Sequence, residues 1–372
     1  MRTGPRTLVL AAALTTWGCQ QGFCETATYQ PQPDRLYRNR GNGTFADVTG
    51  SAGVGREFGP ALGVIAADLD RDGWVDIYVA NDGQENQLWH NGRDGTFANV
   101  ALLAGAAVPV HGAPEASMGV DAGDFDNDGD EDLFMTELAR EGSNLYANDG
   151  TGTFSDGSAA AGLGPASFGH TGFGAAWFDF DNDGWLDILT VNGDVQIIQT
   201  LAQAGDPFPL HQPQQLFHNL GSGRFEPVTA RAGAVFALSE VSRGAAFGDI
   251  DNDGDTDVVV ANNNGPVRLI INNVGNRNHR LGLRLVGAAT GQGPRDMLGT
   301  EVHIVRADGS TLLRRARADG SYGSANDPRV LVGLGESGEA VDLRVRWPDG
   351  RSETWRQVGA DRYVTLVQGE GR

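Results

Sequence analysis

The stretch that decides the fold is Asp179-Phe-Asp-Asn-Asp-Gly-Trp-Leu-Asp187, because its pattern D-x-D-x-D-G-x-x-D occurs four times in 372 residues. The other copies begin at Asp68, Asp124 and Asp249. A hard cation such as Ca2+ takes roughly six to eight oxygen ligands, and carboxylates at alternate positions of a curled loop converge on one point. The glycine at the sixth position can adopt the positive φ that a sharp turn requires. The stretch therefore predicts four calcium loops, with about four Ca2+ ions per chain.

The predicted ligands are the aspartates at positions 1, 3, 5 and 9 of each loop, joined by the backbone carbonyl of position 7. A short apolar run follows position 9 in every copy, which indicates that the loops connect β-strands. The sixteen ligand residues are Asp68, Asp70, Asp72, Asp76, Asp124, Asp126, Asp128, Asp132, Asp179, Asp181, Asp183, Asp187, Asp249, Asp251, Asp253 and Asp257.

The alternative is that these aspartates only form solvated turns, as aspartate often does. Two carboxylates about 4 Å apart repel by about 4 kcal/mol at an effective dielectric constant near 20. Arg71 is the one basic residue inside the loops. We therefore expect a metal ion, and no protein cation, to lie among the carboxylates.

The composition supports this view. The formal net charge is −20, and the sixteen loop aspartates account for most of it. Nucleic acid is excluded as a partner class, because phosphate binding needs a basic surface. Both cysteines, Cys19 and Cys24, lie near the N-terminus, so the rest of the chain carries neither a disulfide framework nor a thiolate zinc cluster.

Two further motifs repeat around the loops. L-x-x-N begins at Leu36, Leu88, Leu145, Leu216 and Leu269, and G-x-F begins at Gly43, Gly95, Gly152 and Gly223. The loops start 56, 55 and 70 residues apart, which suits four short antiparallel strands per unit. The sequence predicts an all-β fold with a β-propeller of about four blades over residues 36–276, and an insert at 196–215 that projects from one face.

The ends of the repeat region suggest how the ring closes. The last unit lacks a G-x-F strand, and the N-terminal segment 43–49 supplies one. We expect it to pair with 269–272, which would seal the ring and hide both edges. The strand at 36–39 is then surplus, so an extra partial blade or an incompletely closed array stays open as an alternative.

The remaining segments differ in character. Residues 277–372 lack aspartate loops, hold 15 arginines against 12 acids, and alternate polar and apolar residues. They predict a second, smaller all-β domain of the sandwich type, drawn electrostatically to the acidic repeats. Residues 1–24 have the basic start and short apolar core of an export signal, possible lipidation falls on Cys19, and 25–35 is a linker.

These features carry a family resemblance. Residues 36–276 resemble FG-GAP (VCBS) repeats, the blades of integrin α-subunit propellers. Residues 277–372 resemble the ASPIC/UnbV domain, notably at 281–287, 298–302, 320–324, 332–335 and 347–351. This order is similar to the cartilage acidic protein family and its bacterial relatives. The resemblance implies calcium-bound loops on the sixteen aspartates, and it lends no enzymatic activity. It also implies seven blades, which this chain is too short to hold.

Two functions are weighed. The first is an exported, secreted, periplasmic or lipid-anchored module that binds an extracellular protein or glycan without catalysis. The second is an extracellular hydrolase of polysaccharides or esters with the propeller as scaffold. The chain has no G-x-S-x-G or H-E-x-x-H motif.

The histidines His111, His170 and His211 could line one face, while His90 and His218 share a repeat position that indicates a structural role. Aromatic residues at Trp74, Trp185, Phe168, Phe173 and Phe208 could form a binding surface, although core packing is the stronger interpretation; Trp347 and Trp355 are expected in the core.

Overall fold

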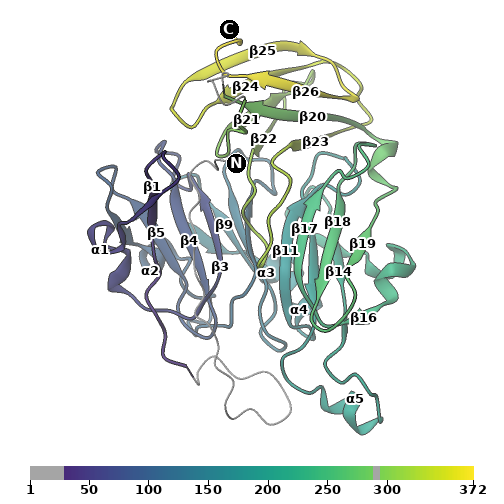
Figure 1. The fold of residues 1–372 in the computed structure, drawn as a ribbon. Coiled ribbons are helices and arrows are strands. Elements are labelled where there is room, and N and C mark those ends of the chain that lie inside the picture. Colours follow the sequence, from purple (N-terminus) through teal and green to yellow (C-terminus); the bar gives the residue numbers. More distant parts are fainter. Residues whose placement is uncertain (1–28, 288–293) are drawn as a thin grey trace.

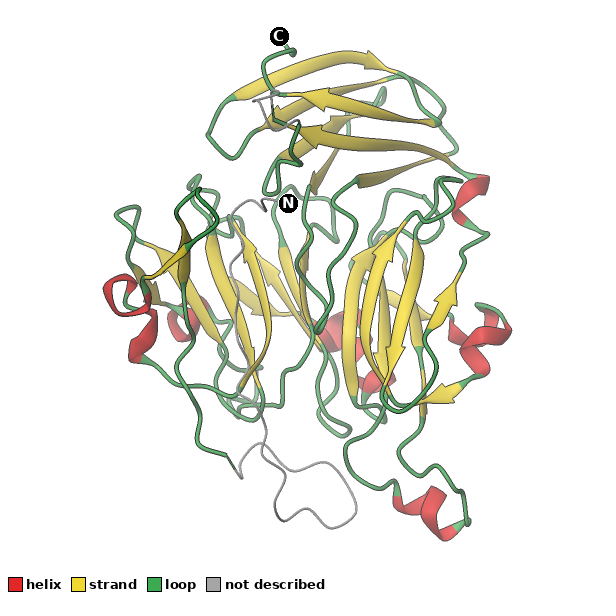
Figure 2. Cartoon of the chain, viewed as in Figure 1, coloured by secondary structure: helices red, strands yellow, loops and turns green. Residues whose placement is uncertain are grey.

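A computed structural model of the chain describes residues 29–287 and 294–372. The described part is all-β and consists of short strands with a few brief helical turns (Figures 1 and 2). The predicted export signal with Cys19 lies outside the described residues. Strands up to Ile270 form several small sheets that stand side by side, and strands from His279 onward form a second unit across one end of them.

Three of the small sheets have four antiparallel strands in sequential order, as the repeats predict. In each sheet the aspartate loop joins the first two strands, the third strand ends in L-x-x-N, and the fourth carries G-x-F. The first sheet contains β3 (Ala61–Ala67), β4 (Asp76–Asn81), β5 (Gln87–Asn91) and β6 (Phe97–Asn99). The second contains β7 (Val120–Gly123), β8 (Asp132–Met135), β9 (Asn144–Asn148) and β10 (Phe154–Asp156). The third contains β11 (Gly172–Phe178), β12 (Asp187–Asn192), β14 (Gln215–Asn219) and β15 (Phe225–Pro227).

The fourth sheet has three strands: β17 (Ser242–Gly248), β18 (Asp257–Asn262) and β19 (Arg268–Ile270). The prediction that residues 43–49 close the ring on this sheet is wrong. That segment forms β2 (Phe45–Asp47), which pairs with β1 (Tyr37–Asn39). Strand β1 is itself an L-x-x-N strand a few residues away, and closing so short a loop costs far less entropy than reaching β19. The described strands thus form an open array.

The sheets are arranged around a common middle, with their first strands inside (Figure 1). Neighbouring inner strands are in contact, β3 with β7, β7 with β11 and β11 with β17. An apolar core lies between each pair of neighbouring sheets; the leucines of the L-x-x-N motif, Leu88, Leu145 and Leu216, are each buried in one of them. This alternation of sheets and cores is propeller packing. In each of the first three sheets, the next sheet along the chain covers the motif leucine.

A short helical turn follows each G-x-F strand and contributes small side chains to these cores. The turns are α1 (Thr49–Ala52), α2 (Ala101–Ala104), α3 (Ser158–Ala161) with α4 (Leu163–Ser167), and two 3-10 turns at Thr229–Arg231 and Ala234–Ala237. The first three end on glycines with φ of 85°, 77° and 81°, the left-handed conformation that favours glycine at a helix end.

The predicted insert projects from the end of the sheets opposite the second unit (Figure 1). It carries α5 (Gln199–Gln203) and is tied back by β13 (Gln212–Pro213), which pairs with β16 (Ser239–Glu240).

The second unit is the predicted sandwich of two sheets around one core. Strand β20 (His279–Val286) lies between β23 (Val330–Gly335) and β26 (Arg362–Val367). The facing sheet has the order β22 (Thr311–Arg315), β21 (Glu301–Val305), β24 (Val341–Arg346) and β25 (Ser352–Val358). Trp347 is fully buried in the shared core, and Trp355 packs against it with the ring centroids 6.2 Å apart.

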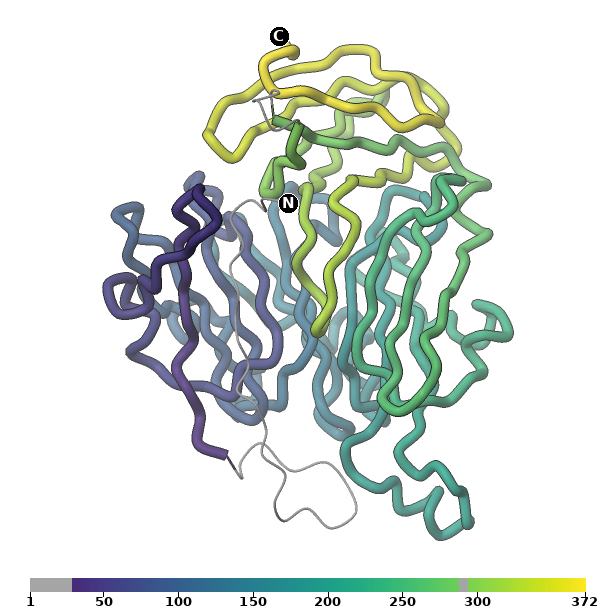
Figure 3. Tube along the Cα trace, viewed as in Figure 1, coloured from purple at the N-terminus to yellow at the C-terminus, as the bar shows by residue number. Residues whose placement is uncertain are grey.

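The connection between β22 and β23, residues 316–329, leaves the sandwich and runs down among the inner strands of the four sheets (Figure 3). We call it the central segment. The Ser321 amide donates to the Val120 carbonyl of β7 (2.9 Å), and the Asp327 amide donates to the Phe247 carbonyl of β17 (2.9 Å). In return the Ala66 amide of β3 donates to the Asp319 carboxylate (2.9 Å). The central segment therefore fills the middle of the open array.

Candidate metal centres

All four aspartate loops lie at the end of the sheets that faces the C-terminal sandwich (Figure 1). Each loop joins the two inner strands of one sheet, and its position-9 aspartate is the first residue of the second strand. The position-6 glycines have φ between 93° and 98°, as the turn was predicted to require. The loops begin at Asp68, Asp124, Asp179 and Asp249, and we number them 1 to 4 in this order.

Internal hydrogen bonds curl each loop. The carboxylate at position 1 accepts the amide hydrogen of the position-6 glycine in loops 1, 3 and 4, at 2.8, 2.9 and 2.9 Å. The carboxylate at position 3 accepts the amide hydrogen of position 5 in loops 1, 2 and 4, at 3.1, 3.3 and 3.2 Å. These bonds bring alternate carboxylates to the same side of the loop.

The asparagine of the L-x-x-N motif fixes the position-9 aspartate, a role that the sequence analysis did not assign. Its backbone amide donates to the position-9 carboxylate in all four sheets, at 2.7 to 2.9 Å: Asn91 to Asp76, Asn148 to Asp132, Asn219 to Asp187 and Asn272 to Asp257. The Asn148 side chain also donates to the Leu69 carbonyl of loop 1 (2.8 Å), and that of Asn219 donates to the Phe125 carbonyl of loop 2 (2.9 Å). The recurrence of one asparagine after every loop was the signal for this link between neighbouring loops.

The predicted ligands do come together. In loop 1 the carboxylate oxygens of Asp68, Asp70 and Asp72 all lie within 4.8 Å of one another. The same holds for Asp124, Asp126 and Asp132 in loop 2, and for Asp179, Asp181 and Asp183 in loop 3. Oxygen atoms this close are suited to share one hard cation.

The electrostatics of the loops are unfavourable without a cation. Burial raises the pKa of Asp132 to about 9 and that of Asp187 to about 7. Neighbouring carboxylates add to this upward shift, and hydrogen bonds to each carboxylate reduce it. Burial raises the pKa of Asp76 and Asp124 to about 6. The side chains at position 7 in loops 2 and 4, Asp130 and Asp255, have a pKa raised to about 7, first by burial and then by nearby acids.

Several of these carboxylate oxygens are buried and make no hydrogen bond within the described part of the chain. They are Asp68 Oδ1, both oxygens of Asp124, Asp130 Oδ1, Asp181 Oδ1, Asp249 Oδ1 and Asp255 Oδ1. A buried polar atom without a partner costs about 1–3 kcal/mol, and more if it is charged. A divalent cation would supply the missing partner, so the residues present fit Ca2+.

The expectation that no protein cation approaches the loops is wrong. Arg346 of β24 lies 3.1 Å from the Asp68 carboxylate, and Arg93 lies 2.6 Å from that of Asp72. At loop 4 the Tyr363 hydroxyl donates to Asp249 (2.6 Å). The sequence could not show this, because these groups reach the loops from a later turn of the same sheet or from the other domain.

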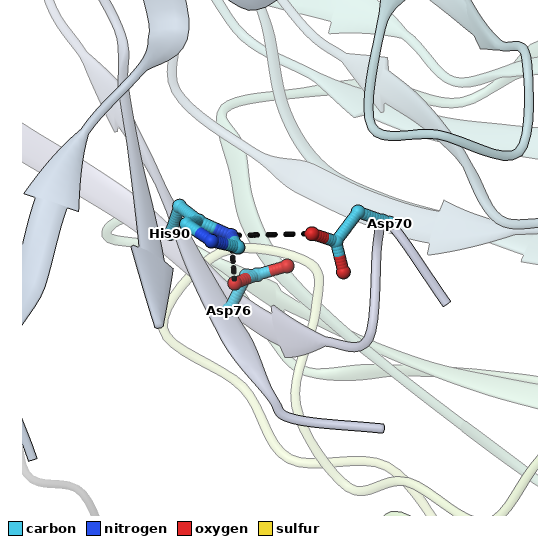
Figure 4. A group of neighbouring side chains, drawn as sticks. All are labelled: Asp70, Asp76 and His90. Carbon is cyan, nitrogen blue, oxygen red and sulfur yellow. Dashed lines mark ion pairs between the residues drawn. The ribbon is translucent and has the colours of Figure 1, made fainter. Parts of the chain in front are cut away.

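The two histidines of the L-x-x-N strands also belong to the loops. His90 Nδ1 lies 3.3 Å from oxygens of both Asp70 and Asp76 (Figure 4). His218 Nδ1 lies 3.2 Å from Asp187, and this hydrogen bond raises the pKa of His218 to about 9. Loops 2 and 4 have Ala147 and Ile271 at the matching position.

The remaining candidates do not form one site. His111 pairs with Glu115 (2.9 Å), and His211 bonds the Ser239 carbonyl (2.8 Å) and stacks on Phe208. Burial lowers the pKa of His170. Phe173 packs in the interior against Tyr322, whereas Trp74, Phe168 and Phe208 are about half exposed.

The sandwich contacts the loops mainly through arginines, as the opposite charges of the two domains predict. Arg315 lies 2.9 Å from Glu131 of loop 2, and Arg314 donates to the Gly184 carbonyl of loop 3 (2.9 Å). Arg329 donates to the Asp249 carbonyl of loop 4 (2.6 Å). Thus the same domain rests on all four loops, because Arg346 reaches loop 1.

No helix among the described residues has both the length and the apolar character needed to span a membrane.

Comparison with known proteins gives two family matches and several relatives. The model of the FG-GAP-like repeat matches residues 23–79, 68–135, 124–190 and 211–260, and the model named ASPIC and UnbV matches 290–372. Cartilage acidic protein 1 of Mus musculus is 30% identical over 179 residues, and that of Homo sapiens is 29% identical over 204 residues. The matches cover 46% and 53% of this chain but 26% and 28% of the relatives, so they span about a quarter of those proteins' length.

Among solved structures, a lectin of Agrocybe aegerita that recognises non-reducing terminal N-acetylglucosamine aligns with 66% of this chain and 77% of its own, at 15% identity and a TM-score of 0.30. The V. cholerae biofilm matrix protein Bap1 aligns with 87% of this chain and 52% of its own, at 11% identity and a TM-score of 0.32. The repeats, the loops and the two domain matches agree: the chain belongs to the FG-GAP-like repeat family and carries an ASPIC/UnbV domain after its repeats.

Proposed function

We propose that this chain is an exported calcium-binding module that serves adhesion or the binding of an extracellular protein or glycan, without catalysis. The observation that carries the proposal is the set of buried carboxylate oxygens without a hydrogen-bond partner, which recurs in all four loops. The relatives named cartilage acidic protein and the non-catalytic nature of the matched families support the adhesion or binding part.

The ligand set favours Ca2+. The sixteen loop aspartates and the four position-7 carbonyls offer only oxygen atoms, which suit a hard cation. Extracellular calcium modules have Kd values of about 10⁻⁴–10⁻³ M, and such sites fill outside the cytosol. Each ion bound only by the folded state would add about 2.7 kcal/mol to the free energy of unfolding at a hundredfold excess over Kd.

The role of the metal in this proposal is structural. Each loop is linked to the next by the motif asparagines, and the arginines of the sandwich rest on the loops. A cation that neutralises the aspartates stiffens the hairpin ends on which the second domain sits. The rigid loop end and the sandwich together then present the surface that binds a partner. The predicted signal segment would place the protein outside the cytosol, as a secreted or periplasmic protein, or at the cell envelope if Cys19 carries a lipid.

The test counts metal and measures stability in the same sample. Mature protein at equilibrium with millimolar calcium is expected to hold about four Ca2+ per chain, counted against the calcium in the dialysate, and to melt at a clearly lower temperature with EDTA. Asp187→Asn should lower the calcium count by about one, whereas Glu339→Gln, on the exposed surface, should leave it unchanged.

An unchanged melting temperature in EDTA, or protein without bound alkaline-earth metal at millimolar calcium, would contradict the proposal. Turnover of a generic ester or glycoside that is lost on replacing His111 or His211 would instead favour the hydrolase.

A further inference from the structure

The fourth sheet lacks the strand that completes the other three. Strands β6, β10 and β15 lie on the outer side of the L-x-x-N strands β5, β9 and β14. Strand β19 is the corresponding strand of the fourth sheet, and in the described residues it pairs only with β18. Its outer edge is therefore an open row of backbone donors and acceptors.

The leucine of the motif shows what is missing. Leu88, Leu145 and Leu216 are 3%, 0% and 5% exposed, but Leu269 of β19 is 53% exposed. Next to it Val267 and Ile271 are 66% and 39% exposed. Natural proteins protect edge strands with charge, proline or a covering element, because an apolar edge pairs readily with another chain.

The three complete sheets show which polypeptide fits this edge. The leucine carbonyl accepts the amide hydrogen three residues after the G-x-F phenylalanine, from Val100 to Leu88, Gly157 to Leu145 and Val228 to Leu216, at 2.8 Å each. The leucine amide donates to a polar side chain near the same place: Asn99, Ser158 or Thr229, at 2.9 to 3.1 Å. Leu269 has neither bond in residues 29–287 and 294–372.

The rest of the fourth sheet is built like its sisters. The Asn272 backbone amide donates to Asp257 of its own loop (2.9 Å) and its side chain donates to the Phe180 carbonyl of loop 3 (2.7 Å), as Asn148 and Asn219 do to their own and neighbouring loops. Strand β19 is in register with β18 through Leu269 opposite Val259, which matches Leu216 opposite Leu189 in the third sheet. The edge is thus already in the conformation that accepts an added strand.

We propose that β19 is a docking edge for a strand of another polypeptide with the pattern of the third sheet's outer strand, which is G-x-F-x-x-V followed by a hydroxyl residue (Gly223 to Thr229). The added strand, which we call the guest strand, pairs antiparallel with β19. Its phenylalanine lies opposite Asn272, as Phe225 lies opposite Asn219. Its valine and the helical turn that follows cover Leu269. Main-chain bonds of this kind give affinity and the buried side chains give specificity.

This inference specifies one surface of the binding module proposed above and rests on that proposal, although it does not require metal at any loop. Metal counting on the same sample keeps the two apart. Protein that holds its calcium but fails the experiment below contradicts only the docking edge.

The probe is a labelled synthetic peptide with the sequence of residues 221–234, the chain's own third-sheet guest. It is added to the full mature protein with calcium, and fluorescence anisotropy is read together with hydrogen exchange. We expect saturable binding and slower exchange at residues 268–272. A peptide with Phe225→Ala, or a scrambled one, should bind at least tenfold more weakly.

Leu269→Asp is the matched protein variant, and Leu103→Asp, at an 89% exposed leucine of α2 beside the first sheet, is its control. Leu269→Asp should abolish peptide binding with an unchanged melting temperature, because the leucine is already half exposed. Absence of binding to folded wild-type protein would overturn the proposal. The proposal would also be overturned if the protein self-associates, if this slows hydrogen exchange at residues 268–272, and if the peptide does not displace the bound copy. The strand on β19 would then come from a second copy of this chain.

Discussion

Replacement of Arg317 tests how the central segment is held. Arg317, near the start of the central segment, contacts Asp121 of β7, whose side chain is fully buried. One guanidinium nitrogen donates to Asp121 Oδ2 at 2.7 Å, and the amides of Trp177 and Ala122 donate to the same carboxylate at 2.8 and 3.0 Å. Arg317→Ala leaves these two amide donors but removes the only charge in contact with Asp121 among the described side chains.

Breaking a buried ion pair by removing one partner costs about 3–5 kcal/mol, because an uncompensated charge remains. The two amide bonds place the expected loss at the lower end, about 3 kcal/mol. We would measure it as the shift in urea unfolding free energy at fixed calcium, and add hydrogen exchange at 316–329 to see whether the central segment opens first. Arg356→Ala, which breaks an exposed pair with Asp342 at 3.5 Å, should change the value by less than about 1 kcal/mol.

A double variant decides the cause. Arg317→Met with Asp121→Asn removes both charges and keeps an acceptor oxygen for the Trp177 and Ala122 amides, and removal of both members of a buried pair is often neutral. It should recover most of the stability that Arg317→Ala loses. A loss below about 1 kcal/mol for Arg317→Ala, or a double variant no more stable than the single one, would refute the electrostatic account.

Three further outcomes are expected. Asn219→Ala should cost about 2–3 kcal/mol in urea unfolding, because its buried side chain donates to the Phe125 and Leu186 carbonyls. Asn91→Ala should cost less, because that side chain is more exposed and, among the described residues, donates only to the Val75 carbonyl. Trp347→Ala should destabilise the sandwich by about 3–5 kcal/mol, and Trp355→Ala, only partly buried, by less; near-UV circular dichroism during unfolding would compare the two, and equal losses would contradict the packing. In metal-free protein the pKa of His218 is raised from 6.5 to about 9, so the charged imidazole stabilises the folded state fully below pH 6.5, and this stability is lost as the pH rises through 9. Urea unfolding in EDTA should show that loss in the wild type and a smaller loss in His218→Ala. Equal dependence of the unfolding free energy on pH in the two proteins would exclude the histidine as its source.

Much of the candidate site could be predicted because the relevant interactions are local. A loop of nine residues brings Asp68, Asp70 and Asp72 together through its own hydrogen bonds and one positive-φ glycine. The spacing of carboxylates along the chain therefore specifies where they point. The same holds for the sheets, since each hairpin joins strands that follow one another directly.

Other parts of the site depend on groups far apart in sequence. Arg346 meets Asp68, and Tyr363 meets Asp249, only because the sandwich rests on the loop end of the sheets. The role of the motif asparagine belongs to the same class, because Asn148 bridges to a loop in the neighbouring sheet.

Ring closure shows the limit most clearly. The pattern of the segment at 43–49 matches both β1 and the open edge of β19, and pattern alone cannot choose between two equivalent L-x-x-N strands. Chain entropy favours the near partner, and residues 316–329 fill the middle instead. The sequence by itself determined the aspartate loops, the strand units and the division into two domains, because these follow from short-range periodicity and turn geometry. Only the tertiary structure decided which edge stays open and which arginines face the loops, because those outcomes depend on how whole sheets and domains pack.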